Sequence, residues 1–211
     1  MTSPDTVSTT HPHAITDAFV AYVLAIRQSS TARSALKRGE SPTTDRYTDP
    51  YLTRFWANRP HMREPMVVFA SLAAAFDNIP HAPGFSPGAL IRELDHRRVF
   101  GTDRAGDSQE LAPIEIRLGT LQSQPLSYLR RFLVRCLNEA EKHRLGLDWE
   151  ALWNLIRSWD HPAADIQART RRTLGAQFWA HHIPDPTTTP DTPDINGELP
   201  SSAPDTESDA Q

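Results

Sequence analysis

The chain has 211 residues, enough for one medium domain or two small helical lobes. Its formal charge of −4 is unevenly distributed: residues 1–13 and 184–211 hold eight of the 26 acidic residues and no basic one, so residues 14–183 carry 18 acids, 22 bases and a net charge of +4. Cys136 is the only cysteine, which excludes an internal disulfide and a cage of thiolate metal ligands. No apolar run approaches the length of a membrane span, so we expect a cytoplasmic protein.

Helical spacing dominates the first half of the chain. Residues 14–26 place apolar side chains three and four positions apart, which is typical of an amphipathic helix. The segment 30–39 predicts a short helix that ends at Gly39. Residues 65–76 are almost entirely apolar, which is typical of the central helix of a bundle. Two further helices are predicted over 49–57 and 89–100, with a Pro/Gly-rich loop over 77–88.

The second half begins after a Gly- and Asp-rich stretch, which we expect to be a hinge. A helix over 125–143 carries a stripe of leucines and is predicted to stop at Gly146. Asp148 is placed to cap the next helix, and a last helix is predicted from about Pro162 to Trp179. The prediction is an all-α fold with two helical lobes, 14–100 and 114–183, a hinge loop 101–113, and disordered termini 1–13 and 184–211.

The sequence Asp160-His161-Pro162 suggests either catalysis or the start of a helix. Proline favours the first turn of a helix, and an aspartate beside it can accept from the free amides, so we predict that Asp160 is a cap. A metal-dependent phosphohydrolase would need the order His-Asp and further histidines on nearby helices, whereas Asp95-His96 repeats the reversed order. We therefore predict no catalytic residue, no metal and no cofactor.

Arginines make up 20 of the 22 basic residues, and some of the basic residues form three clusters on the predicted helices. In chain order the clusters are Arg33, Lys37 and Arg38, then Arg130, Arg131, Arg135 and Lys142, and then Arg169 and Arg172. Arginine offers a flat, permanently charged group that suits phosphate and can stack on bases. Solvated helix faces also need charged residues, and a GC-rich genome favours arginine codons, so both explanations stay open here. Trp149, Trp153 and Trp159 share an apolar face and are predicted to be core residues rather than base-stacking platforms.

Two segments resemble a known family. Residues 128–179 combine an arginine-bearing helix, a turn that leads into Asp-Trp, a Trp-Asp-x-Pro break and a closing helix that ends in Phe-Trp. Residues 32–39 read ARSALKRG, similar to an N-terminal Ala-Arg-x-x-Leu-Arg-Arg-Gly signature with Lys37 in place of an arginine. Together these motifs resemble the CasB-type small subunit of the type I-E CRISPR Cascade complex.

The resemblance implies a non-catalytic helical subunit, present in paired copies, that contacts the large subunit and the guide-RNA backbone subunits. It also implies that basic surface faces the guide RNA and the target DNA strands opened in the R-loop, and it implies no membrane partner. The residues that would bind nucleic acid are Arg33, Lys37, Arg38, Arg130, Arg131, Arg135, Arg157, Arg169, Arg171 and Arg172.

Two other functions remain open at this point. One is a helical scaffold whose arginines serve protein interfaces without touching nucleic acid. The other is a phosphohydrolase built on Asp95, His96, Asp160 and His161.

Overall fold

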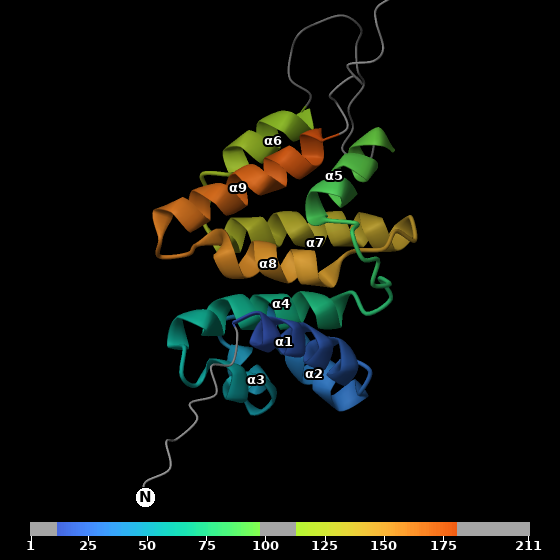
Figure 1. The fold of residues 1–211 in the computed structure, drawn as a ribbon. Coiled ribbons are helices and arrows are strands. Elements are labelled where there is room, and N and C mark those ends of the chain that lie inside the picture. Colours follow the sequence, from blue (N-terminus) through green and yellow to red (C-terminus); the bar gives the residue numbers. More distant parts are fainter. Residues whose placement is uncertain (1–11, 98–112, 181–211) are drawn as a thin grey trace, which may run out of the picture. The chain divides into compact units, whose positions relative to one another are not determined.

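The computed structural model describes residues 12–97 and 113–180 (Figure 1). Every regular element in these two ranges is a helix, and one isolated parallel bridge joins His81 to Leu147. The predicted all-α fold is therefore confirmed. Within the described ranges no helix combines the length and the apolar character that a membrane crossing requires. The predicted disordered segment 184–211 and most of the predicted segments 1–13 and 101–113 lie outside the described residues. Pro12, His13 and Pro113 are described, and each belongs to a helix.

The helices follow the sequence pattern closely. In the first part of the chain they are α1 (Pro12–Ile26), α2 (Ser30–Lys37), α3 (Asp49–Trp56), α4 (Arg63–Ala75) and α5 (Pro87–His96). In the second part they are α6 (Pro113–Leu121), α7 (Leu126–Lys142), α8 (Trp149–Trp159) and α9 (Ala164–Trp179). Three 3₁₀ turns connect the early helices: η1 (Arg38–Glu40), η2 (Asp45–Thr48) and η3 (Pro60–Met62).

Helix α4 is the centre of the fold. Its residues Met66 to Ala74 are all buried, so the helix has no solvated face along this stretch. Helices α1, α2 and α3 contact it, and α7 and α8 contact it as well (Figure 1). Three rings meet beside it: Trp153 lies 4.6 Å from Phe19 and 5.5 Å from Phe69 between ring centroids. The predicted central position of this segment is confirmed.

One hydrophobic cluster contains buried residues from both predicted lobes. Trp149, Trp153 and Trp159 are at most 2% exposed, which confirms that they are core residues. Cys136 is fully buried, and burial raises the pKa of its thiol, which therefore stays protonated and unreactive. The division into two lobes falls on a segment that is mostly outside the described residues and remains a prediction.

Two glycines, each predicted to end a helix, have other positions in the structure. Helix α2 ends at Lys37, and Gly39 lies in η1, where a Cβ atom would be 2.9 Å from Cγ1 of Val67. Gly39 is therefore needed because α4 passes close to its backbone, not because it ends a helix in the left-handed conformation. Helix α7 ends at Lys142, and the positive φ after it, 55°, belongs to Arg144. The predicted stop at Gly146 was therefore wrong.

Asp148 caps α8 as predicted, since its Oδ1 accepts from the backbone N–H groups of Glu150 and Ala151, each at 3.0 Å. Asp160 is also a cap, but the sequence prediction assigned it to the wrong helix. Helix α9 starts only at Ala164, without a side-chain cap. Oδ2 of Asp160 instead accepts from the first backbone N–H of α7, that of Leu126, at 2.7 Å. Asp160 is thus a cap for a helix that starts 34 residues earlier.

We predict opposite effects for two glycine-to-alanine substitutions. Gly39→Ala should destabilise the protein by about 1–3 kcal/mol, because the new methyl group overlaps the α4 side chains. Gly119→Ala should stabilise it by up to about 1 kcal/mol, because Gly119 is exposed in α6 and its added Cβ would meet nothing within 4 Å. Urea unfolding of both variants gives the comparison, and a neutral Gly39→Ala would contradict the close contact.

Asp160→Ala should cost about 1–2 kcal/mol of unfolding free energy, because it removes the cap of α7. The matched control is Asp165→Ala, an exposed aspartate in the first turn of α9 whose loss should cost less than about 1 kcal/mol. Thermal or urea unfolding of the two variants checks this order. Equal losses in the two variants would show that Asp160 contributes only as a surface charge.

Candidate nucleic-acid interface

The first two arginine clusters meet where α7 passes η1. Nη1 of Arg130 donates to the backbone carbonyl of Glu40 at 2.6 Å, although the two residues are 90 positions apart. Burial lowers the pKa of the Arg130 guanidinium, and the charge of Glu40 partly offsets this effect. Arginine remains charged at neutral pH under such a shift. Arg130 therefore joins the basic face of α7 to the basic turn that follows α2.

A surface hollow of about 580 Å³ lies at this junction and is called the η1/α7 hollow below. It combines three arginines of α7 with two carboxylates, so its floor is not uniformly basic. Its lining residues are Glu40, Pro42, Glu64, Val68, Ser127, Arg130, Arg131, Val134 and Arg135.

Arg131 and Arg135 are exposed on α7, one helical turn apart. The opposite face of the helix holds the buried Leu129, Leu133 and Leu137, which confirms the predicted exposure. No ion pair in the described ranges involves either arginine. Their charges are therefore directed to solvent and can bind an external anion.

The three basic residues on α2 and η1 differ from one another in their contacts. Arg33 forms an ion pair with the Asp77 carboxylate, which neutralises part of its charge. Lys37 is exposed. The Arg38 guanidinium is also exposed and lies over the ring of Tyr47, 4.6 Å from its centroid. Lys37 and Arg38 thus add charge close to the η1/α7 hollow.

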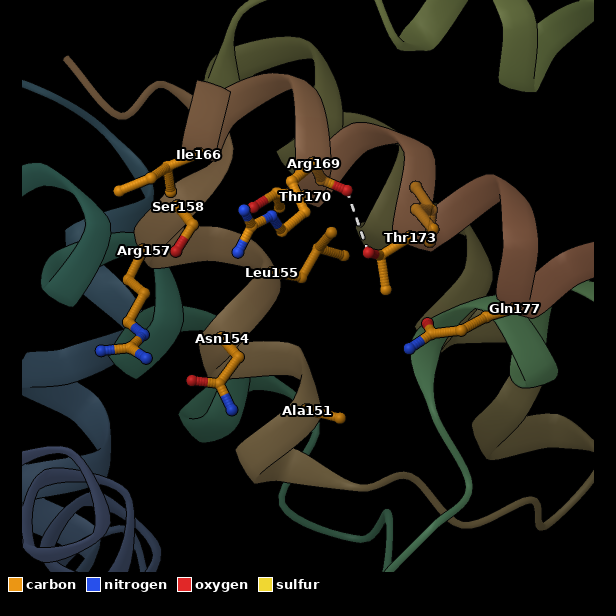
Figure 2. A pocket seen from close by; sticks show the side chains of 11 residues that line it. Ala151, Asn154, Leu155, Arg157, Ser158, Ile166, Arg169, Thr170, Thr173 and Gln177 are labelled. Atoms are coloured by element: carbon orange, nitrogen blue, oxygen red, sulfur yellow. Dashed lines mark hydrogen bonds between the residues drawn. The ribbon is translucent and has the colours of Figure 1, made fainter. Parts of the chain in front are cut away.

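A second depression, about 440 Å³, lies between α8 and α9 and is called the α8/α9 groove below. Figure 2 shows side chains from both helices facing it, including Arg157 from α8 and Arg169 from α9. None of its lining residues is acidic, and the lining also contains hydroxyl, amide and apolar side chains. Such donors beside arginine suit a phosphate group. The remaining lining residues are Ala151, Asn154, Leu155, Ser158, Ile166, Thr170, Thr173, Leu174 and Gln177.

Two arginines that follow Arg169 on α9 differ in their exposure and in their contacts. Arg172 is exposed. Arg171 instead turns inward: Nη1 donates to the carbonyl of Gln122 at 2.6 Å, and Nη2 lies 3.1 Å from Oδ1 of Asp160. Its guanidinium also lies 5.1 Å from the ring centroid of Trp159. Nη1 and Nη2 of Arg171 therefore hold the turn between α6 and α7, and both nitrogens are engaged within the chain.

The phosphohydrolase alternative gains no support from this geometry. Both carboxylate oxygens of Asp160 have partners, and Nδ1 of His161 accepts from the backbone N–H of Ala163 at 3.0 Å. Among residues 12–97 and 113–180, no three His, Cys, Asp or Glu side chains are grouped so that they could hold a metal ion.

Three further residues of interest emerge only from the structure. Arg27 is 6% exposed, donates to the carbonyl of Ala73 at 3.2 Å and lies over Trp149, so it is a structural arginine. Tyr47 and Tyr128 are large exposed side chains with an arginine over the ring. The spacing of Tyr128 and Arg131, three residues apart on one helix, was the available signal for one of these pairs.

Comparisons with known proteins agree with this fold. A crystal structure of a CRISPR-associated protein of the Cse2 family from Thermus thermophilus is similar, with a TM-score of 0.55 and 19% identity. The match covers 78% of this chain and 97% of that one. A chain of a structure described as "CRISPR RNA-guided surveillance complex, pre-nicking" matches with a TM-score of 0.48 and 18% identity, over 79% of this chain and 95% of that one.

No curated protein sequence matches the chain. The sequence model of one family, described as "CRISPR-associated protein Cse2", matches residues 32–179 and so spans more than half of the chain. This range includes the two segments that carried the resemblance in the sequence, as well as the η1/α7 hollow and the α8/α9 groove. The chain therefore belongs to the Cse2 family of CRISPR-associated proteins.

Proposed function

We propose that this protein is the non-catalytic small subunit of an RNA-guided CRISPR surveillance complex of the Cascade type. In this role its basic surfaces bind nucleic acid and stabilise the R-loop on target DNA. Family membership supports the assignment to the complex. The observation that carries nucleic-acid binding is the exposed pair Arg131 and Arg135, which has no ion-pair partner among the described residues.

The physical reason lies in the energetics of target opening. An RNA–DNA duplex is about as stable as the DNA duplex that it replaces, so small contributions decide how far the R-loop extends. Each arginine that neutralises a phosphate on an opened strand favours the open state and releases counterions. Exposed arginines need no base-reading motif for this role. Binding should therefore be insensitive to sequence and sensitive to salt.

The proposed partners follow from the same role. They are the large subunit, the guide-RNA backbone subunits, a second copy of this chain, the guide RNA and the target DNA strands. We propose no membrane partner.

Nine residues form the proposed interface: Arg33, Lys37, Arg38, Arg130, Arg131, Arg135, Arg157, Arg169 and Arg172. Arg171 is left out because its guanidinium is engaged within the chain.

The double variant Arg131→Ala/Arg135→Ala should weaken R-loop formation by the reconstituted complex several-fold. Its stability should change by no more than about 1 kcal/mol, because both side chains are exposed. In the isolated protein, loss of two phosphate contacts should reduce the slope of log affinity against log salt by about 1.4 on single-stranded DNA. The matched control is Lys142→Ala on the same helix, whose ammonium already pairs with Glu139 at 2.7 Å.

Incorporation of the double variant into the complex must be measured separately. Normal incorporation with normal R-loop yield would reject the two arginines as strand contacts. Lost incorporation would point to the scaffold function, in which the same face contacts a neighbouring protein.

Substitutions of two arginines on α9 should have different effects on DNA affinity and on stability. Arg169→Ala should lower affinity for single-stranded DNA and leave stability within about 0.5 kcal/mol, because the side chain is exposed beside the α8/α9 groove. Arg171→Ala should cost about 2 kcal/mol or more, because it removes charged hydrogen bonds to Gln122, Gln124 and Asp160. Unfolding curves and filter binding on both variants test the contrast. The reverse order would mean that Arg171, not Arg169, belongs to the interface.

A further inference from the structure

Two exposed tyrosines share an unusual arrangement. Tyr47 is 40% exposed, with the guanidinium of Arg38 4.6 Å and that of Arg46 5.5 Å from the centroid of its ring. Tyr128 is 48% exposed, and the guanidinium of Arg131 lies 4.7 Å from the centroid of its ring. Each site therefore presents an aromatic ring and a flat cation together on the surface.

Packing does not account for these two rings. The pair formed by Arg54 and Tyr22 has the same chemistry, at 3.8 Å, but Tyr22 is partly buried and packs against the core. Tyr47 and Tyr128 differ from Tyr22 in both respects. They are exposed, and neither is among the side chains packed against the hydrophobic cluster. Tyrosine is enriched at binding interfaces, because it combines an apolar ring with a polar hydroxyl group.

The arginines over the two rings lie on the elements that form the η1/α7 hollow, although neither tyrosine lines it. Arg38, which lies over Tyr47, is two residues from Glu40, the residue that Arg130 contacts. Arg131, which lies over Tyr128, lines the hollow. An extended ligand that runs along η1 and α7 can therefore contact both arginine–tyrosine pairs.

The charges that line the η1/α7 hollow indicate which kind of ligand it can bind. Glu40 and Glu64 line it and repel phosphates, whereas the arginines attract them. A neutral, flat base is not repelled by the carboxylates and can stack on a tyrosine ring or on a guanidinium. Only unpaired bases have free faces, so a single strand fits this surface and a duplex does not.

We propose that Tyr47 and Tyr128 are stacking platforms for unpaired bases of a single-stranded nucleic acid. The guanidinium groups of Arg38 and Arg131 extend these platforms and carry the charge that attracts the backbone. This inference rests on the proposed function and adds to it a contact with bases, which makes the protein selective for a strand that has been opened.

The test compares two oligomers of equal length and charge, oligo-dT and a deoxyribose-phosphate chain without bases, on the full-length protein. Oligo-dT should bind more tightly, by on the order of tenfold for each stacked base. In Tyr47→Leu/Tyr128→Leu this preference should vanish, while affinity for the abasic chain stays unchanged. Tyr47→Phe/Tyr128→Phe should keep it, because the ring remains. The matched control is Ile116→Ala, which removes an apolar side chain that is 56% exposed elsewhere, on α6.

The outcomes separate the two proposals. Equal affinity of the unsubstituted protein for both oligomers, with the expected salt dependence, would overturn base stacking and leave phosphate binding intact. Binding to neither oligomer at low salt would overturn the proposed function and this inference with it. A preference that survives the leucine variants would exclude these two tyrosines.

Discussion

The burial of α4 is the constraint on which the rest of this fold depends. Its residues 66–74 are covered on every side, so the helix is stable only when other helices enclose it. Helices α1 to α3 and helices α7 and α8 supply that cover from two different parts of the sequence. As a result η1, at the end of α2, lies against α7, and the contact between Arg130 and Glu40 becomes possible.

This enclosure also divides the arginines into two kinds. Arg27 and Arg171 are held by backbone carbonyls and by tryptophan rings, so their charge stabilises helix contacts inside the molecule. Arg131, Arg135 and Arg169 are exposed on the surface formed by the described residues. The residue type is the same, and only the position relative to α4 and α8 separates a structural arginine from one that can meet a phosphate.

The two candidate surfaces differ in the chemistry that they offer. The α8/α9 groove has arginines and neutral donors without an acid in its lining, which suits a phosphate backbone. The η1/α7 hollow mixes arginines with carboxylates, and one of its arginines, Arg131, lies over the exposed Tyr128, which suits neutral bases near a charged backbone. A protein with both surfaces could hold an opened strand through its phosphates and its bases together.

The sequence by itself determined the features that depend on near neighbours in the chain. Periodicity located the helices, Asp148 caps a helix that begins one residue later, and the leucine stripe of α7 implied that Arg131 and Arg135 face solvent. The order of several motifs also led to the family that matches residues 32–179.

The tertiary structure alone decided the features that join distant segments. Asp160 caps a helix that starts 34 residues before it, and Arg130 reaches a carbonyl 90 residues away. Gly39 is required by a helix that passes its backbone rather than by its own turn. A local pattern records which face of a helix is apolar, but not which helix will cover that face. Long-range partners therefore follow only from how the helices pack around α4.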